Sequence, residues 1–255
     1  MLSLYQYRDL LLIHVLSDIK SRYKQSLLGP AWAILFPLVL MLIFVVVRSI
    51  VGIDSDGIPY PIFAYSALLP WTLFANSITF ATPKIVQSRS LIRKVYFPRE
   101  ILPVAGVMTA LVDFLLAFII LAGLMAYYHI APTLAVLWVP VLLVIQLFLA
   151  VGVGLVTSAL GGFRRDIVVA IPLLIQFWML LCPVVYPLSS VPAEYQSYYL
   201  MNPMAGLIET WRTVLIVGEA PEMRLMASAV IGTLLVCALG YWFFKRVEMK
   251  FADIV

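Results

Sequence analysis

Residues 89–103 read R-S-L-I-R-K-V-Y-F-P-R-E-I-L-P and place four basic side chains between two long apolar runs. A short connection rich in Lys and Arg between membrane segments marks the cytoplasmic face. The prolines at 98 and 103 bracket a piece that can form a short helix, because proline disfavours helical geometry in the residue before it. Two interpretations of this basic, aromatic stretch stay open: a docking surface for another protein, and an anchor that only fixes orientation.

The composition indicates an integral membrane protein. Of the 255 residues, 64% are hydrophobic and 12% are charged, whereas a soluble domain has about 45–50% apolar and about 25% charged residues. The net charge of +4 is concentrated in loops on one side of the membrane, so nucleic acid is not expected as a partner. Cys182 and Cys237 lie in apolar context without metal-ligand spacing, which predicts neither a disulfide framework nor a metal site.

Six apolar segments, each near the length of about 20 residues that crosses roughly 30 Å of hydrocarbon, predict an all-α, multi-pass membrane domain covering residues 1–255. The predicted spans are 31–51, 62–82, 104–127, 134–160, 167–188 and 225–244. With the N-terminus inside, fourteen of the 17 Lys and Arg residues face the cytoplasm, and only Arg48, Arg212 and Arg224 face outward. This asymmetry predicts a protein of the cytoplasmic, or inner, membrane with both termini in the cytoplasm.

Residues 4–26 precede the first span and predict an amphipathic helix. One stripe is apolar at helical spacing and carries Leu12, Val15, Leu16, Ile19 and Tyr23. The opposite face is polar and carries Asp9, Ser17, Asp18, Lys20, Ser21, Lys24 and Gln25. Such a helix lies in the membrane interface; the alternative is a cap packed on a soluble partner. Leu28-Gly29-Pro30 then turns the chain into the bilayer.

The segment 189–224, between the fifth and sixth spans, is half apolar, although it is predicted to lie outside. Ala205 to Val217 has apolar residues at helical spacing, with Asn202-Pro203 as a start signal and Gly218 as a stop. A pair of short helices that dip back from the outer surface within 189–218 fits this pattern. Non-spanning backbone at membrane depth is tolerated where protein or a water-filled cavity surrounds it.

Signatures of catalysis are missing from the sequence. No Gly is followed by Lys, so the chain has no Walker A loop, and neither G-x-S-x-G nor H-E-x-x-H occurs. His14 and His129 are predicted on opposite sides of the membrane. We therefore expect that the chain is not an enzyme, and that energy for work against a gradient comes from a partner or an ion.

Few polar residues fall inside the predicted spans. Asp113 in the third span is either a functional site or a structural acid near the interface, bonded to a neighbouring helix or a cytoplasmic arginine. Gln146 and Gln176 are expected to form hydrogen bonds between helices, and the glycines of the fourth span to permit close helix packing. Mid-span aromatic residues either pack or line a track for a glycan: Trp32, Phe36, Phe44, Tyr65, Trp71, Phe74, Phe177 and Trp178.

Several separated motifs resemble one family. Residues 18–32, D-I-K-S-R-Y-K-Q-S-L-L-G-P-A-W, are similar to the R-Y-x-x-S-x-L-G-x-x-W signature of the membrane subunits of ABC exporters for polysaccharides and polyol phosphates. Residues 91–103 resemble the F-P-R-E segment of that family, and so do N-P-M-A-G-L-I-E at 202–209 and the F-A-D tail at 251–253. The resemblance extends over nearly the full chain, and the family includes exporters of O-antigen, capsule and teichoic acid.

The resemblance implies a homodimer with two copies of a separate ATPase subunit that binds ATP and Mg, with no cofactor on this chain. The implied ATPase contacts are the coupling element 91–102 and the turn 161–166, with Arg93, Lys94, Tyr96, Phe97, Pro98, Arg99, Glu100, Arg164 and Arg165. The implied outer gate includes Asn202, Pro203, Glu209, Trp211 and Arg212. The implied interfacial helix presents Lys20, Arg22, Tyr23 and Lys24, and we expect its basic residues to attract the pyrophosphate of a lipid carrier.

We therefore predict that the chain is the permease subunit of an ATP-driven exporter for a lipid-linked polysaccharide. One alternative is an ABC exporter of small lipids or drugs, which usually has a larger outer domain than the short Gly52–Tyr60 connection. Another is an ion-coupled carrier, which the single Asp113 disfavours. A membrane-embedded glycosyltransferase would need clustered acids, whereas Asp54, Asp56 and Glu194 are scattered.

Overall fold

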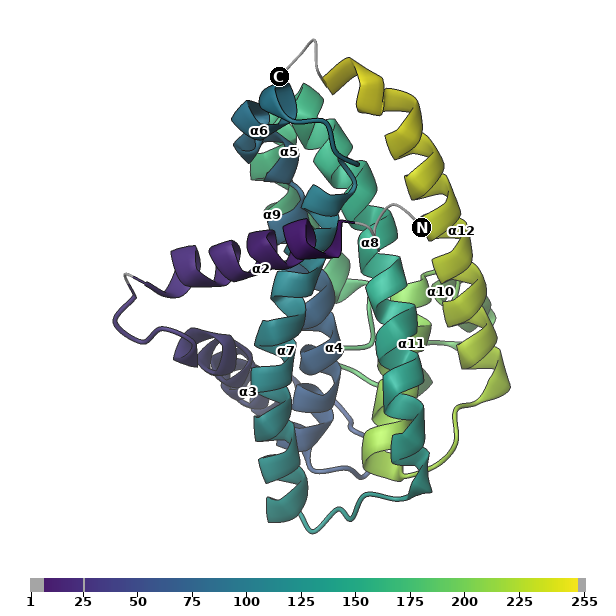
Figure 1. The fold of residues 1–255 in the computed structure, drawn as a ribbon. Helices are drawn as coiled ribbons and strands as arrows, with labels where there is room; N and C mark the ends of the chain where they lie inside the picture. Colours follow the sequence, from purple (N-terminus) through teal and green to yellow (C-terminus); the bar gives the residue numbers. More distant parts are fainter. Residues whose placement is uncertain (1–6, 25, 252–255) are drawn as a thin grey trace.

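The computed structural model describes residues 7–24 and 26–251, and the regular structure in these ranges is entirely helical (Figure 1). The elements are α2 (Arg8–Tyr23), α3 (Ala31–Val51), α4 (Tyr60–Ala81), α5 (Lys84–Gln87), α6 (Arg89–Lys94), α7 (Ile101–Tyr127), η1 (Leu134–Trp138), α8 (Val139–Phe163), α9 (Arg165–Leu180), η2 (Leu188–Ser190), α10 (Ala193–Tyr199), α11 (Pro203–Arg212), η3 (Thr213–Val217), α12 (Met223–Val247) and η4 (Glu248–Lys250). The predicted all-α class is confirmed. In Figure 1, α7, α8 and α12 run along the length of the molecule, and α2 lies across α7.

Four segments of the described chain are long and apolar enough to cross a membrane: α3, α7, the continuous run of η1 and α8, and α12. The bounds of α3 are those predicted. The largest difference is in α9, which ends at Leu180 although the predicted span extended to residue 188. Its 16 residues measure about 24 Å, less than the roughly 30 Å of hydrocarbon. Pro183 and Pro187 follow, and proline cannot continue a helix.

The centre of the bundle is α4. It packs against α3, α7, α8, α9 and α11, and its side chains from Ile62 to Phe74 are all buried. Because these helices shield it, α4 can carry hydroxyl residues such as Ser66 and Thr72, which bond to carbonyl oxygens of their own helix. These polar residues lower the mean hydropathy of α4, so α4 is not among the four segments that are apolar enough to cross a membrane.

Glycines allow α8 and α12 to approach closely, as predicted for the fourth span. A Cβ atom on Gly152 would lie 2.8 Å from Cα of Cys237 in α12. A Cβ atom on Gly240 would in turn meet the carbonyl oxygen of Gly152. Since no larger residue fits between backbones at this separation, the two glycines fix the contact between the helices.

The segment between α9 and α12 contains the two predicted short helices, α10 and α11. The side chain of Asn202 accepts a hydrogen bond from the backbone N–H of Met204 at 3.1 Å and caps α11. The chain continues past Arg212 as a π-helical turn, η3, which ends where Gly218 adopts a φ of +80°. The predicted start and stop are confirmed. Within the bundle, α11 packs against α4, α8 and α12.

The side of α2 that faces the bundle carries charged residues as well as the buried Val15. Asp18 pairs with Lys84 of α5, and Arg22 pairs with Asp113 of α7. Leu12 and Leu16 point away from the bundle and are 55% and 53% exposed. Asp18, which belongs to the predicted polar face, is thus directed toward a partner that is distant in sequence. The exposed leucines fit a helix lying on a lipid surface; residues 4–6 and 25 of the predicted element lie outside the described residues.

Candidate functional site

The residues that connect α6 to α7 form a projection at one end of the bundle, here called the coupling knuckle (residues 93–100). Arg93, Lys94, Val95 and Tyr96 are exposed, and the Tyr96 side chain is 93% exposed. An aromatic ring and an aliphatic residue beside basic groups have the composition of a protein-binding surface, where aromatic residues and arginine are enriched. The tip of the knuckle is therefore the candidate docking surface for another protein.

The base of the coupling knuckle is fastened to α12. Glu100 is 4% exposed, and its carboxylate accepts a hydrogen bond from Nζ of Lys245 at 2.8 Å. Arg99 donates to the main-chain carbonyl of Glu248. Phe97 is buried and belongs with Phe244 to a small apolar core at this end of the molecule. Thus the predicted coupling residues divide into an exposed tip and an inward-facing base, which also includes the half-buried Pro98.

The second predicted contact, Arg164 and Arg165, lies at the same end of the bundle. Both side chains are exposed. The neighbouring Phe163 ring lies 5.6 Å from the ring of Phe251, measured between centroids, and Phe251 lies 5.6 Å from Phe244. Phe251 therefore joins the turn 161–166 to the end of α12, and it shares a small apolar core with Phe97 of the coupling knuckle. Ala252 and Asp253, the rest of the F-A-D motif, lie outside the described residues.

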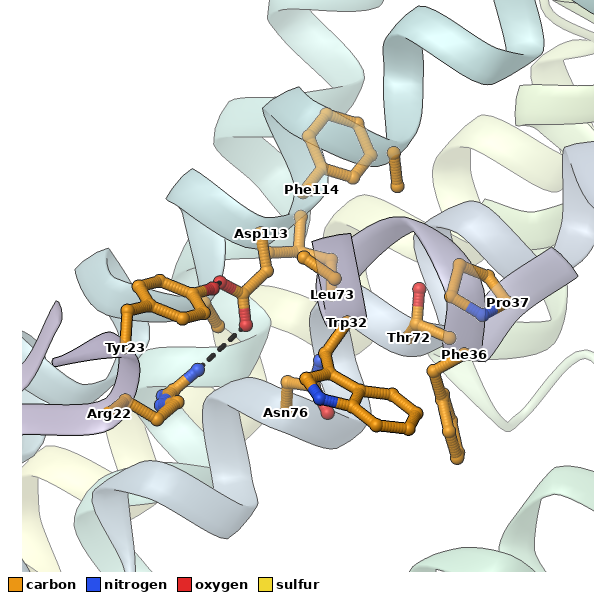
Figure 2. A pocket seen from close by; sticks show the side chains of 13 residues that line it. Arg22, Tyr23, Trp32, Phe36, Pro37, Thr72, Leu73, Asn76, Asp113 and Phe114 are labelled. Atoms are coloured by element: carbon orange, nitrogen blue, oxygen red, sulfur yellow. Dashed lines mark hydrogen bonds and ion pairs between the residues drawn. The ribbon is translucent and has the colours of Figure 1, made fainter. Parts of the chain in front are cut away.

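A cavity of about 190 Å³, lined by apolar side chains and a few polar ones, lies where α2, α3, α4 and α7 meet (Figure 2). At the α2 end, Nη1 of Arg22 lies 2.8 Å from Oδ2 of Asp113, and the Tyr23 hydroxyl donates to Oδ1 of Asp113 at 2.6 Å. Figure 2 shows the Asp113 carboxylate directed toward both partners. The guanidinium of Arg22 also stacks 3.6 Å from the centroid of the Phe80 ring. Asp113 is thus bonded to an arginine of a neighbouring helix, a partner of the kind that its structural alternative predicts.

The protonation of Tyr23 follows from this geometry. Burial, together with the hydrogen bond to the Asp113 carboxylate and its charge, raises the pKa of Tyr23 to about 12. The phenol thus stays neutral and keeps donating to Asp113. Because the charges of Arg22 and Asp113 cancel, the lining of the cavity carries no net charge.

The rest of the cavity wall is aromatic on one side and polar on another. Trp32 and Phe36 contribute from α3, whereas Thr72 and Asn76 contribute from α4. No hydrogen bond from the described residues reaches the half-buried Asn76 side chain. Sequence reasoning missed Asn76; the available signal was one amide within the apolar run of the second predicted span.

The eight aromatic channel candidates separate into three groups by their exposure. Tyr65, Trp71 and Phe74 are buried inside the chain, where the Tyr65 hydroxyl donates to the carbonyl of Ala117 at 3.0 Å. These three residues therefore pack inside the chain and are not exposed to a track for a glycan. By contrast, Trp32 and Phe36 are each 55% exposed and Phe177 is 60% exposed. Two further candidates are partly buried, Phe44 and Trp178.

The outer-gate candidates connect α11 to the rest of the bundle. The Arg212 guanidinium is 3% exposed, bonds to Glu209 at 2.5 Å and donates to the carbonyl of Pro183 at 2.8 Å. Nε1 of Trp211 donates to Oε1 of Gln146 at 2.8 Å, and the Gln146 amide donates to the carbonyl of Pro70. The predicted interhelical role of Gln146 is confirmed. Gln176, in contrast, lies on the exposed side of α9.

The helical bundle, its apolar segments of membrane length and its basic end define the chain as an all-α integral membrane protein. The ABC-2 type transporter family matches residues 10–216, and the chain belongs to that family. The resemblance predicted from the separated motifs is thereby confirmed.

Relatives within the family are similar over almost the whole chain. The chain is 33% identical to the O-antigen export system permease protein RfbA of Myxococcus xanthus, over 98% of this chain and 96% of the relative. It is 28% identical to RfbA of Klebsiella pneumoniae, over 97% and 95%. It is 24% identical to the polysialic acid transport protein KpsM of Escherichia coli, over 91% of each. The similarity to the RfbA proteins, at 97–98% of this chain, therefore includes α2, the coupling knuckle and most of α12.

Proposed function

We propose that this chain is the permease subunit of an ATP-driven ABC exporter that moves a lipid-linked polysaccharide across the cytoplasmic membrane. The support is family membership together with full-length similarity to permeases named for O-antigen export and polysialic acid transport. The polymer is of the O-antigen, capsule or teichoic-acid type. The chain transports and does not hydrolyse ATP, because the ATPase is a separate subunit that binds ATP and Mg.

The proposed topology has six spans, with both termini in the cytoplasm. The four apolar segments are joined by α4 and by the predicted span 167–188, in which the turns after Leu180 extend the short helix α9. The aromatic cluster of Phe163, Phe244 and Phe251 brings the coupling knuckle, the start of α9 and the end of α12 to one end. Most basic side chains gather there, in agreement with a cytoplasmic face. In this arrangement α10 and α11 are the non-spanning helices near the outer surface.

The ATPase docks on the tip of the coupling knuckle and on the turn with Arg164 and Arg165. The single observation that carries this assignment is the 93% exposed Tyr96 at the tip of a knuckle whose base is buried. A projection of this kind offers an anchor for a partner while its position stays fixed by the chain. Closure of the ATPase dimer would displace the knuckle and, through Glu100 and Lys245, move α7 and α12 together.

Two copies of the chain would enclose the channel between them. The largely exposed helices support this: α9 has Ile175 as its single buried residue, and α3 has only Pro37 and Met41. Apolar faces this wide are covered either by lipid or by a second copy. Of the aromatic candidates, Trp32, Phe36 and Phe177 project from these two helices and would line the path, with Phe44 and Trp178 behind them.

The docking assignment is tested with Tyr96→Ala in membranes that also contain the ATPase subunit. Removal of the exposed ring should weaken co-purification of the ATPase at least about tenfold, since anchors of this kind contribute about 2 kcal/mol or more. Tyr127→Ala is the matched control, because Tyr127 is 75% exposed at the opposite end of α7. Equal ATPase recovery with both variants would rule out the knuckle as the docking site.

This variant is more informative than charge reversal at Arg99 and Glu100. Both of those side chains bond to the end of α12 inside the same chain. Their reversal would therefore disrupt the base of the knuckle as well as any contact with a partner. Tyr96 has no such internal function at 93% exposure.

The transport assignment is tested by depleting the protein in its native cell and locating lipid-linked glycans. Finished polymer should accumulate on the cytoplasmic face of the membrane. Intact surface glycan without accumulation would reject polysaccharide export and favour the exporter of small lipids or drugs.

The basic side chains of α2 provide the proposed site for the diphosphate of the lipid carrier. Lys20 and Lys24 are exposed and lie one helical turn apart, whereas Arg22 is already paired with Asp113. Anionic headgroups should therefore bind mainly through the two lysines. Lys20→Gln with Lys24→Gln should weaken binding of polyprenyl diphosphate, and equal binding after both changes would contradict this assignment.

A further inference from the structure

The cavity under α2 contains a polar group without a partner. Asn76 projects from α4 into the cavity, and its amide has two donors and an acceptor that no hydrogen bond from the described residues satisfies. Such a group is costly in a partly buried membrane site unless water or a ligand completes its hydrogen bonds. An amide that only supported the fold would be expected to bond to a neighbouring helix, as Gln146 does.

The charges around the cavity define which ligands it can accept. Asp113 neutralises Arg22 at 2.8 Å, so no excess positive charge is available for a phosphate. The carboxylate itself would repel an anion. Each oxygen of Asp113 accepts one described hydrogen bond and can accept a second, for example from a hydroxyl. The cavity therefore favours a neutral ligand rich in hydroxyl groups.

The aromatic wall and the size of the cavity narrow this class further. The indole of Trp32 lines the cavity and is 55% exposed, so its face is available for stacking. An aromatic face next to a carboxylate and an amide suits a sugar ring, whose C–H groups stack while its hydroxyls form hydrogen bonds. A volume of about 190 Å³ is smaller than the roughly 300–1,000 Å³ of a drug-sized site. This is room for one ring and not for an oligosaccharide.

We propose that this cavity is a subsite for a single neutral sugar ring, the ring attached to the lipid carrier. The inference rests on the proposed function, which supplies the lipid-linked glycan. Lys24 follows Tyr23 directly, so the proposed diphosphate site on α2 adjoins the cavity wall formed by Arg22 and Tyr23. The lysines would hold the diphosphate, while Asn76, Asp113 and Trp32 bind the first ring.

The test compares two kinds of lipid on the full chain with its ATPase subunit in lipid nanodiscs. One probe is a polyprenyl diphosphate without sugar. The others are the same lipid carrying one hexose or one N-acetylhexosamine. The dissociation constant of each is measured by native mass spectrometry. The unmodified protein should bind at least one of the sugar-bearing lipids about tenfold more tightly than the bare lipid, as expected for one or two hydrogen bonds formed in a partly buried site.

Asn76→Leu should abolish this preference and leave the affinity for the bare lipid unchanged. Thr79→Val on the same helix is the matched control, since Thr79 does not line the cavity and bonds to its own helix at Ala75. Trp32→Ala should reduce the preference, and Trp32→Tyr should restore it because the aromatic face returns. The thermal unfolding midpoint of Asn76→Leu without ligand should not fall, whereas a purely structural amide would make it fall.

The outcomes separate the two proposals. If the unmodified protein binds the sugar-bearing and bare lipids equally, or if Asn76→Leu keeps the preference, the sugar subsite is rejected and the lipid-export function stands. If the unmodified protein binds none of the lipids, the proposed function is rejected as well. Weaker binding of every lipid with Lys20→Gln and Lys24→Gln, with an unchanged ratio between sugar-bearing and bare lipid, supports separate sites for diphosphate and sugar.

Discussion

Nζ of Lys245 in α12 lies 2.8 Å from Oε2 of Glu100, the residue that directly precedes α7. This ion pair connects α12 to the start of α7. Lys245 also lies 2.7 Å from Oε2 of Glu248, and Arg99 donates to the carbonyl of Glu248. The coupling knuckle is thus bound at its base to the end of α12. A displacement of the knuckle would therefore move α12 directly through these contacts, and it would not need to be transmitted through α7.

The first prediction concerns this ion pair. Lys245→Met should lower the stability of the protein by about 2 kcal/mol, because it leaves the buried Glu100 carboxylate without its cation. The figure is modest since Lys245 is one-third exposed and solvent screens part of the interaction. The same change should reduce the amount of glycan exported per ATP hydrolysed, measured in proteoliposomes with the ATPase subunit.

The double variant Glu100→Gln with Lys245→Met serves as its control. It removes both charges and should recover part of the lost thermal stability, as expected for coupled residues. Full export efficiency in Lys245→Met would show that the link to α12 does not transmit movement.

The second prediction concerns Tyr23 at high pH. Its folded pKa of about 12 lies above its ordinary value of 10.0, mainly through burial and then through Asp113. The stabilisation from the neutral phenol is complete below pH 10 and is lost as the pH rises through 12. Asp113→Asn should lower the pKa of Tyr23, yet leave it above 10 because burial persists. The measurement is a pH titration of tyrosinate absorbance, with Tyr23→Phe subtracted; an unchanged titration in Asp113→Asn would contradict the contact.

The third prediction concerns acid sensitivity at the contact between α2 and α5. Burial lowers the pKa of His14 below its ordinary 6.5 against the raising effect of Asp18, and Lys84 lowers it further. Nε2 of His14 has no hydrogen-bond partner among the described residues. Above pH 6.5 the His14 ring is neutral in both the folded and the unfolded chain, so it adds no pH dependence to the stability. Below pH 6.5 the unfolded chain takes up the proton before the folded chain does. The free energy of unfolding therefore decreases as the pH is lowered.

His14→Phe should therefore flatten the fall in the thermal midpoint between about pH 6.5 and pH 5. The exposed His129, with a φ of +57°, provides the control as His129→Asn, since Asn tolerates that backbone conformation. Acid sensitivity should persist in this control. If it persists equally in His14→Phe, another group is responsible.

The fourth prediction concerns the contact between α8 and α12. In Gly240→Ala the new methyl group meets the carbonyl oxygen of Gly152, so the helices must separate. We expect a loss of about 1–3 kcal/mol in stability, the usual cost of overpacking. Gly123→Ala in α7 is the matched control, because its methyl group would meet nothing within 4 Å. Equal thermal midpoints for the two variants would mean that the close approach is absent.

The sequence by itself determined the class of the protein and most of its elements. The length and composition of an apolar helix are local properties set by the bilayer, so α3 appears at the predicted bounds. Local turn chemistry likewise placed the start of α11 at Asn202-Pro203 and the stop at Gly218. The motifs that carry the family resemblance are also readable without coordinates.

Only the tertiary structure decided which side of each helix faces inward. Tyr65 and Phe177 are both aromatic residues within predicted spans, yet one is buried and the other is 60% exposed. The rotation of a helix about its axis is set by its neighbours and not by its own sequence when nearly every residue is apolar. Pairing between residues distant in sequence cannot be predicted from the sequence either. Arg22 and Asp113, for example, lie 91 residues apart. The charge balance of the cavity, and with it the neutral ligand we infer, exists because folding brings these two residues together.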